Sequence, residues 1–194
     1  HIGRSHTLTQ WLDPSIVNEA DPDHRDAELN LYDPQNPHQP PYDSAFVEQY
    51  RAAQRARSQR ISAWVLDRLA SFKAAGEPLR EQGFVVHGTM ADPKWLDPTI
   101  DPNGRQPRWC FLGDPEVVNM SPIGLARFCT LRSWLSQWSD EHSNADGVRC
   151  APKVTVPALV VGNGADDACT PGDTEALFNA LGSQDKTQIG RAHV

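Results

Sequence analysis

The sequence predicts a mixed α/β protein in two parts: a helical, loop-rich region over residues 1–150 and a strand–turn–helix unit over residues 151–188. Two observations support this division. In the first part, apolar residues at helical spacing are separated by many Asp-Pro steps, which favour turns. In the second part, a β-branched run is followed by a segment with helix-capping signals. A continuous apolar strand is typical of a parallel sheet that is covered on both faces.

Turn signals dominate residues 1–43. Asp13, Asp21 and Asp33 each precede a proline, and Pro37, Pro40 and Pro41 follow. Because proline blocks a continuing helix, we expect an ordered arm of loops and short helical turns, with disorder as the alternative. Its expected anchors are apolar: Trp11, Leu12, Leu29 and Leu31.

The strongest helix signal follows this arm. Apolar residues recur at helical spacing from Phe46 to Phe72, after a possible cap at Asp43 or Ser44. Gly76 and Pro78 are expected to end the helix. Five arginines lie off the apolar stripe, and we interpret them as a solvated face rather than a polyanion site, since the chain has a net charge of −7: Arg51, Arg55, Arg57, Arg60 and Arg68.

The rest of the chain carries four further element signals. Residues 83–88 read as a short strand that ends in a turn, and a second helix is predicted from Ser121 to Trp138, with Pro122 in its first position. The β-branched run 154–161 predicts a strand. Residues 162–170 predict a turn, and residues 171–181 predict a helix with Gly182 just beyond its end.

The turn after the predicted strand is the main candidate for chemistry. Ligands of parallel α/β sheets bind at the carboxyl ends of strands, and an acid there can orient a histidine and stabilise its protonated form. The aspartate three residues after Gly164 and four before Pro171 is Asp167, our first candidate for this acid. Counted from Gly162, the turn contains one extra residue, which leaves Asp166 as the alternative. The structural alternative is that either aspartate only caps the following helix.

Several segments, in this order, resemble the C-terminal half of larger bacterial α/β-hydrolase-fold proteins. The segments are Trp11 to Ser15, Tyr50 to Gln54, His87 to Pro93, Arg132 to Ser139 and Val156 to Pro171. The resemblance implies that residues 1–150 are a cap-like insertion and that residues 151–188 belong to the C-terminal part of the core. It also implies a triad of nucleophile, histidine and acid. Cap residues could line a substrate pocket, although packing in the core is the simpler role: His87, Met90, Trp95, Trp134 and Trp138.

The sequence departs from this family pattern in three ways. It lacks the G-x-S-x-G nucleophile elbow, and the segment around Ser5 does not replace it. His87-Gly88 follows rather than precedes the expected nucleophile position, so we interpret it as a turn and not an oxyanion loop. Residues 189–194 match the translation of a common sequencing adapter, so we expect them to be foreign, His193 included. We therefore expect an incomplete chain that carries the acid without its partners.

Three functions remain open. The first is a fragment of a hydrolase for an ester or related acyl bond, inactive alone. The second is a non-catalytic, ligand-binding member of the same fold. The third is a nucleotide-binding module based on Gly162-x-Gly164 and Asp185, although Asp167 stands where a third glycine would be.

The charge and composition argue against two classes of partner, nucleic acids and membranes. A net charge of −7 argues against nucleic acid, and no run approaches the ~18 apolar residues of a membrane span. The four cysteines form no C-x-x-C pair, so we expect reduced structural thiols, with no metal and no cofactor. Cys169 lies beside the acidic turn but is expected to pack. A small-molecule substrate is the expected partner. The oligomeric state is open, and the cytoplasm is the preferred compartment.

Overall fold

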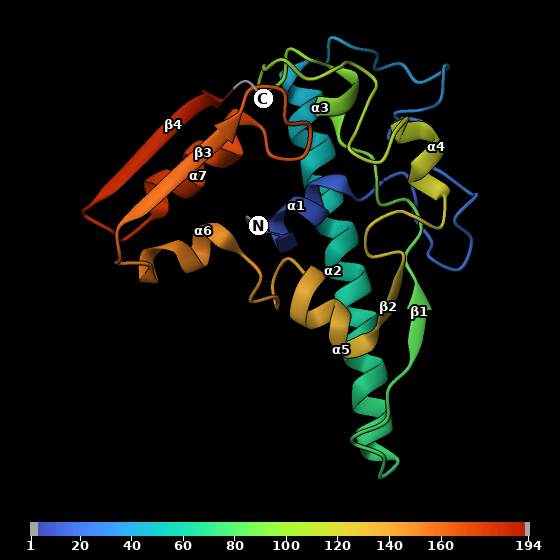
Figure 1. Cartoon of the computed structure of the whole chain (residues 1–194). Helices are drawn as coiled ribbons and strands as arrows, with labels where there is room; N and C mark the ends of the chain where they lie inside the picture. Colours follow the sequence, from blue (N-terminus) through green and yellow to red (C-terminus); the bar gives the residue numbers. More distant parts are fainter. Residues whose placement is uncertain (1–3, 193–194) are drawn as a thin grey trace.

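The structure is a computed structural model that describes residues 4–192 (Figure 1). Its axis is the long helix α2 (Ser44–Ala74), against which α1 (Arg4–Trp11) and the loops pack. A short antiparallel ribbon, β1 (Gly83–Val85) and β2 (Phe128–Thr130), lies along the second half of α2. A βαβ unit stands to one side, formed by β3 (Ala158–Asn163), α7 (Pro171–Ala180) and β4 (Lys186–Ala192). The mixed α/β class is therefore as predicted.

Helix α2 begins and ends where its sequence signals predict. The Asp43 carboxylate accepts a hydrogen bond from the Ala45 N–H, which satisfies one free donor of the first turn. The helix ends at Ala74, and Gly76 follows with φ of +79°, a conformation that favours glycine. The arm before α2 is loop-rich, as expected, and Trp11, Leu12 and Leu31 are buried.

The prediction that the arginines of α2 form a solvated face is wrong for Arg57. Its side chain is fully buried and donates to the carbonyls of Asp13, Gly88 and His87, while Glu19 receives two further bonds. Helical spacing cannot reveal this, because the loops that cover Arg57 come from distant parts of the chain.

The predicted helix from Ser121 to Trp138 is wrong for residues 121–130. Residues 121–127 form turns, with Ala126 at φ of +56°, and Phe128–Thr130 pair with β1 in the register Gly83↔Thr130 and Val85↔Phe128. Only then does a helix begin, as α5 (Leu131–Ser133), capped by Thr130 and continued by the π-helical turn η1 (Trp134–Trp138). Strand pairing with a distant segment overrode the local helical spacing.

Four short helices complete the structure. Two of them begin at Asp-Pro steps, with the aspartate as cap and the proline in the first turn: α3 (Pro93–Leu96) and α4 (Pro115–Met120). The others, α6 (Gly147–Cys150) and η2 (Ala151–Lys153), connect the helical region to the βαβ unit. No helix within residues 4–192 is long and apolar enough to cross a membrane.

The strand β3 starts later than predicted. Residues 154–157 precede it and lie exposed, and Ala158–Asn163 form the strand, because Pro157 lacks the N–H that a ladder needs. Strand β4 runs parallel to it, in the register Ala158↔Lys186 and Val161↔Ile189. Residues 189–192, which we expected to be foreign, thus form the second half of β4.

One face of this two-stranded sheet has no cover among the described residues. Helix α7 packs on the other face. On the open face Leu159 is 61% exposed and Val161 is 48% exposed. The expected sheet covered on both faces is therefore absent from residues 4–192.

Candidate functional site

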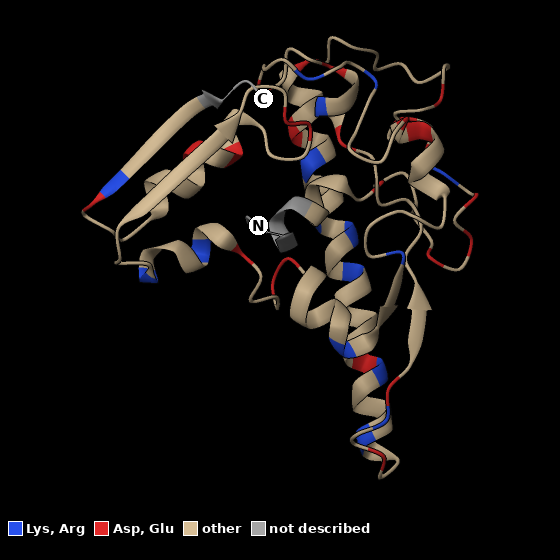
Figure 2. Ribbon diagram, in the orientation of Figure 1, with Lys and Arg blue, Asp and Glu red and all other residues tan. Residues whose placement is uncertain are grey.

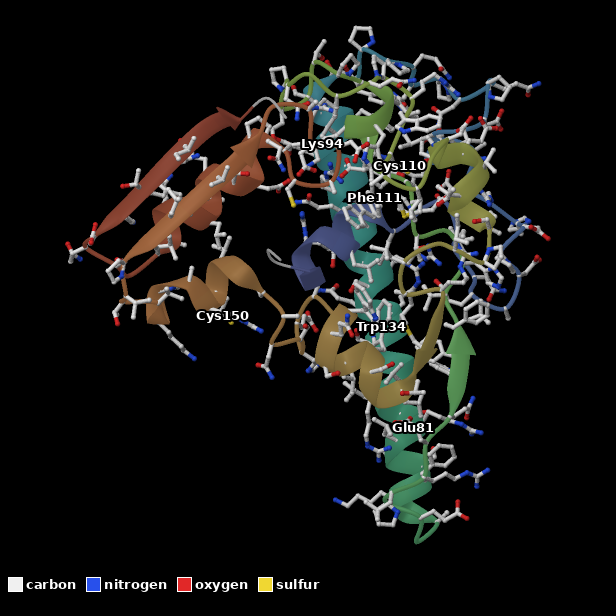
Figure 3. All side chains as sticks on the ribbon, viewed as in Figure 1. Glu81, Lys94, Cys110, Phe111, Trp134 and Cys150 are labelled. Carbon is white, nitrogen blue, oxygen red and sulfur yellow. The ribbon has the colours of Figure 1, made fainter. Side chains whose placement is uncertain are left out.

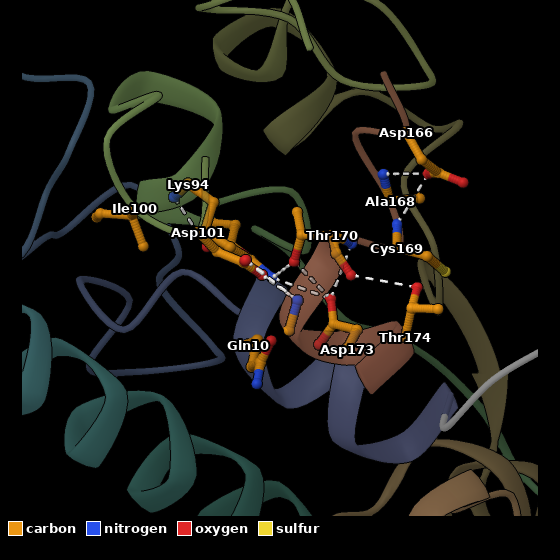
Figure 4. A network of polar contacts seen from close by, with 12 residues as sticks. Gln10, Lys94, Ile100, Asp101, Asp166, Ala168, Cys169, Thr170, Asp173 and Thr174 are labelled. Carbon is orange, nitrogen blue, oxygen red and sulfur yellow. Dashed lines mark hydrogen bonds and ion pairs between the residues drawn. The ribbon is translucent and has the colours of Figure 1, made fainter. Parts of the chain in front are cut away.

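The candidate site is the turn that connects β3 to α7, at the carboxyl end of a parallel strand (Figure 4). Helix α7 starts with a capping box: Thr170 and Asp173 bond each other's backbone and side chains, with Thr170 Oγ1 donating to Asp173 Oδ2 at 2.9 Å. This cap fixes where the turn ends. The turn residues 164–169 are therefore held between the end of the strand and a defined helix start.

Lys94 connects this cap to the helical region. Its ammonium group, which is almost buried, donates to Thr170 Oγ1 at 3.0 Å and to Asp173 Oδ2 at 3.1 Å. Burial alone would raise the pKa of Asp173, but the charge of Lys94 and the hydrogen bonds from Thr170 outweigh it, and the pKa is lowered. Asp173 therefore stays ionised as part of a structural ion pair.

Asp101, which belongs to the helical region, places a second carboxylate at the start of α7. The N–H of Gly172 donates to both carboxylate oxygens of Asp101, at 3.1 and 2.9 Å. This is where a helix would bind a phosphate group. Asp101 and Asp173 thus place two negative charges at the position that a nucleotide-binding module needs for its ligand.

Asp166 shapes the turn itself. Its Oδ1 accepts the N–H groups of Ala168 and Cys169, both at 2.9 Å, and its carbonyl accepts the side-chain amide of Asn103 at 2.7 Å. One oxygen of this carboxylate is therefore used to hold the backbone of the turn.

Asp167 is placed differently. Its carbonyl accepts the indole N–H of Trp95 at 2.7 Å, and its partly buried carboxylate accepts backbone N–H groups from itself and from Phe111. Burial raises the pKa of Asp167, and the charge of Asp166 raises it further, although these hydrogen bonds and Arg105 act in the opposite direction. The two aspartates are therefore adjacent in sequence, but their carboxylates accept hydrogen bonds from different parts of the backbone.

An aromatic cluster supports Asp167. Trp11 lies 5.5 Å from Trp95 and 5.3 Å from Phe111 between ring centroids. Trp95 is buried, whereas Phe111 is half-exposed. Both lie beside the turn that carries Asp166 and Asp167, which we call the acid turn. The sequence alone did not identify Phe111, Lys94, Asp101 or Asn103 as neighbours of the turn. The only available signal was the repeated Asp-Pro pattern, which marks loops but not their contacts.

The neighbouring thiols are not activated. Burial raises the pKa of Cys110, and burial together with the charge of Asp166 raises the pKa of Cys169. A thiol with a raised pKa remains protonated and is a poor nucleophile near neutral pH. All four cysteines are free, as the sequence predicts.

The proposed pocket-lining residues do not form one pocket. Met90, Trp95 and Trp134 are buried in hydrophobic clusters, Trp138 packs against one of them, and His87 is only half-buried. Figure 3 shows Trp134 far along α2 from Lys94, Cys110 and Phe111. The methionine and the three tryptophans therefore pack in the core, which was the simpler of the two roles.

A cavity of about 370 Å³ with mixed polar and apolar walls lies at the carboxyl ends of β3 and β4. Its walls come from the loop at Pro102 and Asn103, from Gly162 to Gly164 and from the first turns of α7. Asp166 and Asp167 are not among its lining residues. Within residues 4–192, no three His, Cys, Asp or Glu side chains gather as a metal site.

Neither Ser5 nor His193 is predicted to belong to a triad. Ser5 lies in α1, a helix, and not on a strand-to-helix turn. His193 lies outside the described residues. Comparison of the chain with protein-family models, with curated proteins and with solved structures gives no match in any of the three.

Proposed function

We propose that this chain is the acid-bearing part of a hydrolase for ester or related acyl bonds, with Asp167 as the acid that orients a catalytic histidine. The nucleophile and this histidine belong to segments outside residues 4–192. The resemblance of residues 9–187 to α/β-hydrolase-fold proteins is the starting point of the proposal.

The observation that carries the proposal is the difference between Asp166 and Asp167. A triad acid stands at the carboxyl end of a strand, where its carboxylate can accept a hydrogen bond from the histidine. The Oδ1 of Asp166 accepts the two N–H groups that shape the turn, whereas the carboxylate of Asp167 accepts its own N–H and that of Phe111, which lies outside the turn. Partial burial strengthens the interaction of Asp167 with a positively charged imidazole.

The direction of β4 supports the same arrangement. Its pairing with β3 is already parallel from Lys186 to Gln188, before the residues that we expect to be foreign, so β4 runs toward the edge of the sheet that carries the acid turn. A loop that followed β4 would start at this edge. A histidine on that loop is the partner that the proposal requires for Asp167.

A nucleotide-binding function is less consistent with the site. The two carboxylates of Asp101 and Asp173 already bond the N-terminus of α7 and would repel a pyrophosphate. The non-catalytic, ligand-binding alternative shares every feature of the acid turn. It differs only in the nucleophile, so the coding sequence upstream of residue 1 distinguishes the two.

The decisive experiment compares Asp167→Asn, Asp166→Asn and the double variant in the parent protein, after its flanking coding sequence has been recovered. We expect Asp167→Asn to lower kcat by up to ~10⁴-fold, because the acid acts mainly as the imidazolium forms. Asp166→Asn should reduce kcat far less. Full activity in all three variants would contradict the proposal, and the reverse ranking would move the acid to Asp166.

The chain alone gives a simpler check. We expect no turnover of p-nitrophenyl acetate above the rate of a Ser5→Ala control, because no motif-supported nucleophile is present. Turnover that Ser5→Ala abolishes would show that the nucleophile lies within this sequence.

A further inference from the structure

A groove on the far side of α2 from the βαβ unit is independent of the acid turn. It has a volume of about 480 Å³ and lies between α2, β1 and the loop at residues 17–20. Its lining is mostly apolar: Val17, Ala20, Ile61, Trp64, Phe84, Val85 and Val86, with Asn18, Glu19 and Arg60. Trp64 is half-exposed in the groove, with its ring 5.2 Å from that of Phe84.

One edge of the groove is the free edge of β1. The Val86 N–H donates to Arg127, and the Gln82 carbonyl accepts from Leu131, so the backbone groups of even-numbered residues point toward β2. By strand alternation, those of Gly83 and Val85 point to the other edge. Within residues 4–192, β1 has no second neighbouring strand. Another extended backbone would satisfy these groups.

The helix wall of the groove carries basic residues. Arg60 and Trp64 line the groove, Arg68 follows four residues after Trp64, and Figure 2 shows several basic residues (blue) along α2. Arg60 donates to the Ile16 carbonyl and Arg68 to the Gln82 side chain, yet both remain exposed. Glu19 lines the groove from the loop at residues 17–20 and is already paired with the buried Arg57. The acid of α2 in this region is Asp67, next to Arg68.

We propose that this groove binds an extended segment of a partner protein in which one apolar residue lies between two acidic residues, in the pattern acidic–x–apolar–x–acidic. The segment adds to the free edge of β1 as a third strand. Its apolar side chain enters the groove over Trp64, and its two carboxylates meet Arg60 and Arg68.

The dimensions of helix and strand match this pattern. Arg60 and Arg68 are eight residues apart on a helix, about 12 Å at ~1.5 Å per residue. In a strand, side chains i, i+2 and i+4 share one face, and four residues span about 13 Å at ~3.3 Å each. The intervening positions i+1 and i+3 then face outward, beside Val85, which is 40% exposed.

The experiment uses the whole chain and a fluorescein-labelled peptide with the core Asp-Thr-Leu-Thr-Glu, measured by fluorescence anisotropy. We expect saturable binding that weakens as salt is added, since exposed charge pairs are screened. The peptide Lys-Thr-Leu-Thr-Lys should bind at least several-fold more weakly. Absence of binding by the acidic peptide at millimolar concentration would overturn the proposal, as would equal binding of the two peptides.

Charge reversal on α2 tests whether the two acidic residues of the peptide lie opposite Arg60 and Arg68. An exposed pair contributes a factor of about two to five in affinity, so Arg60→Glu with Arg68→Glu should weaken binding on the order of 10-fold and allow the lysine peptide to bind instead. Arg55→Glu with Lys73→Glu, an equal charge change at exposed positions elsewhere on α2, is the matched control and should change little. If the control weakens binding as much as the double reversal, the contact is not at the groove.

Two further readouts test the binding mode. Hydrogen exchange at the Val85 N–H should slow when the acidic peptide is bound, because strand addition bonds this edge. Binding without this protection would contradict strand addition. Trp64→Ala should weaken binding while far-UV circular dichroism stays unchanged. If this variant unfolds, the charge-reversal variants still test whether the peptide binds at the groove. Self-association of the chain through this edge, measured by sedimentation, would identify a second copy rather than a partner as the occupant.

Discussion

The helical region and the βαβ unit are held together in different ways. In the helical region, α2 buries polar side chains that donate to loop carbonyls: Gln54 bonds Gln10, Leu12 and Ala91, and Arg57 bonds Asp13, His87 and Gly88. In the βαβ unit, α7 packs on one face of a two-stranded sheet whose other face is exposed. A few buried hydrogen-bond donors hold the loops of the helical region. In the βαβ unit only one face of the sheet is covered, whereas a parallel sheet is usually covered on both faces.

This difference shows where each region is vulnerable. A loop-rich region has many backbone carbonyls without regular partners, and each buried one needs a donor. Arg57 and Gln54 therefore bear more of the stability than an average polar residue. The sheet, by contrast, tolerates polar substitutions on its open face, because those side chains are already in water.

The largest effect should come from Arg57→Leu. Removal of the guanidinium takes one donor from each of three loop carbonyls and the ion-pair partner from Glu19, so we expect the free energy of unfolding to fall by about 3–5 kcal/mol. Urea denaturation measures this. The control Arg55→Leu, on the exposed side of the same helix, should stay within ~0.5 kcal/mol. Equal effects of the two substitutions would refute the role assigned to the buried donor.

An intermediate effect is expected at the junction of the two regions. Lys94→Met removes the ammonium that bonds Thr170 and Asp173, at a cost of about 2 kcal/mol. The loss should appear in the βαβ unit first, as faster hydrogen exchange in α7 than in α2. Uniform destabilisation of both helices would instead mean that the regions unfold as one.

A smaller effect is expected with pH. The pKa of Asp173 is lowered in the folded state, so its ion pair stabilises the protein above the pKa of the unfolded chain. This contribution is lost as the pH falls below about 4 and through the folded-state pKa. The difference in stability between the natural chain and Lys94→Met should therefore narrow in acid. A difference that is constant from neutral pH to pH 2 would show that the pair contributes no charge effect.

The smallest effect should come from the open sheet face. Leu159→Thr should change the free energy of unfolding by less than ~0.5 kcal/mol, because this side chain is 61% exposed. Val160→Thr, on the face that α7 covers, should cost about 1–2 kcal/mol. If Leu159→Thr is the more costly of the two, another part of the molecule covers this face in solution.

The sequence anticipated the elements that depend on local chemistry. The cap at Asp43 and the glycine at 76 delimit α2, and Thr170 with Pro171 begins α7, because capping and backbone freedom are properties of adjacent residues. The position of the acid turn after a β-branched strand was also predictable. Which backbone groups each aspartate binds was not predictable: Asp166 accepts from Ala168 and Cys169, whereas Asp167 accepts from itself and from Phe111.

Tertiary structure decided the features that depend on distant partners. The segment at Phe128 became a strand because β1 was available to pair with it, despite its helical spacing. Arg57 became a buried donor because residues 13, 87 and 88 converge on it from two separate loops. Lys94 and Asp101 reached the start of α7 across more than seventy residues of chain. Local sequence sets helix ends and turns through short-range sterics and capping, whereas burial and long-range hydrogen bonds exist only once the chain has folded.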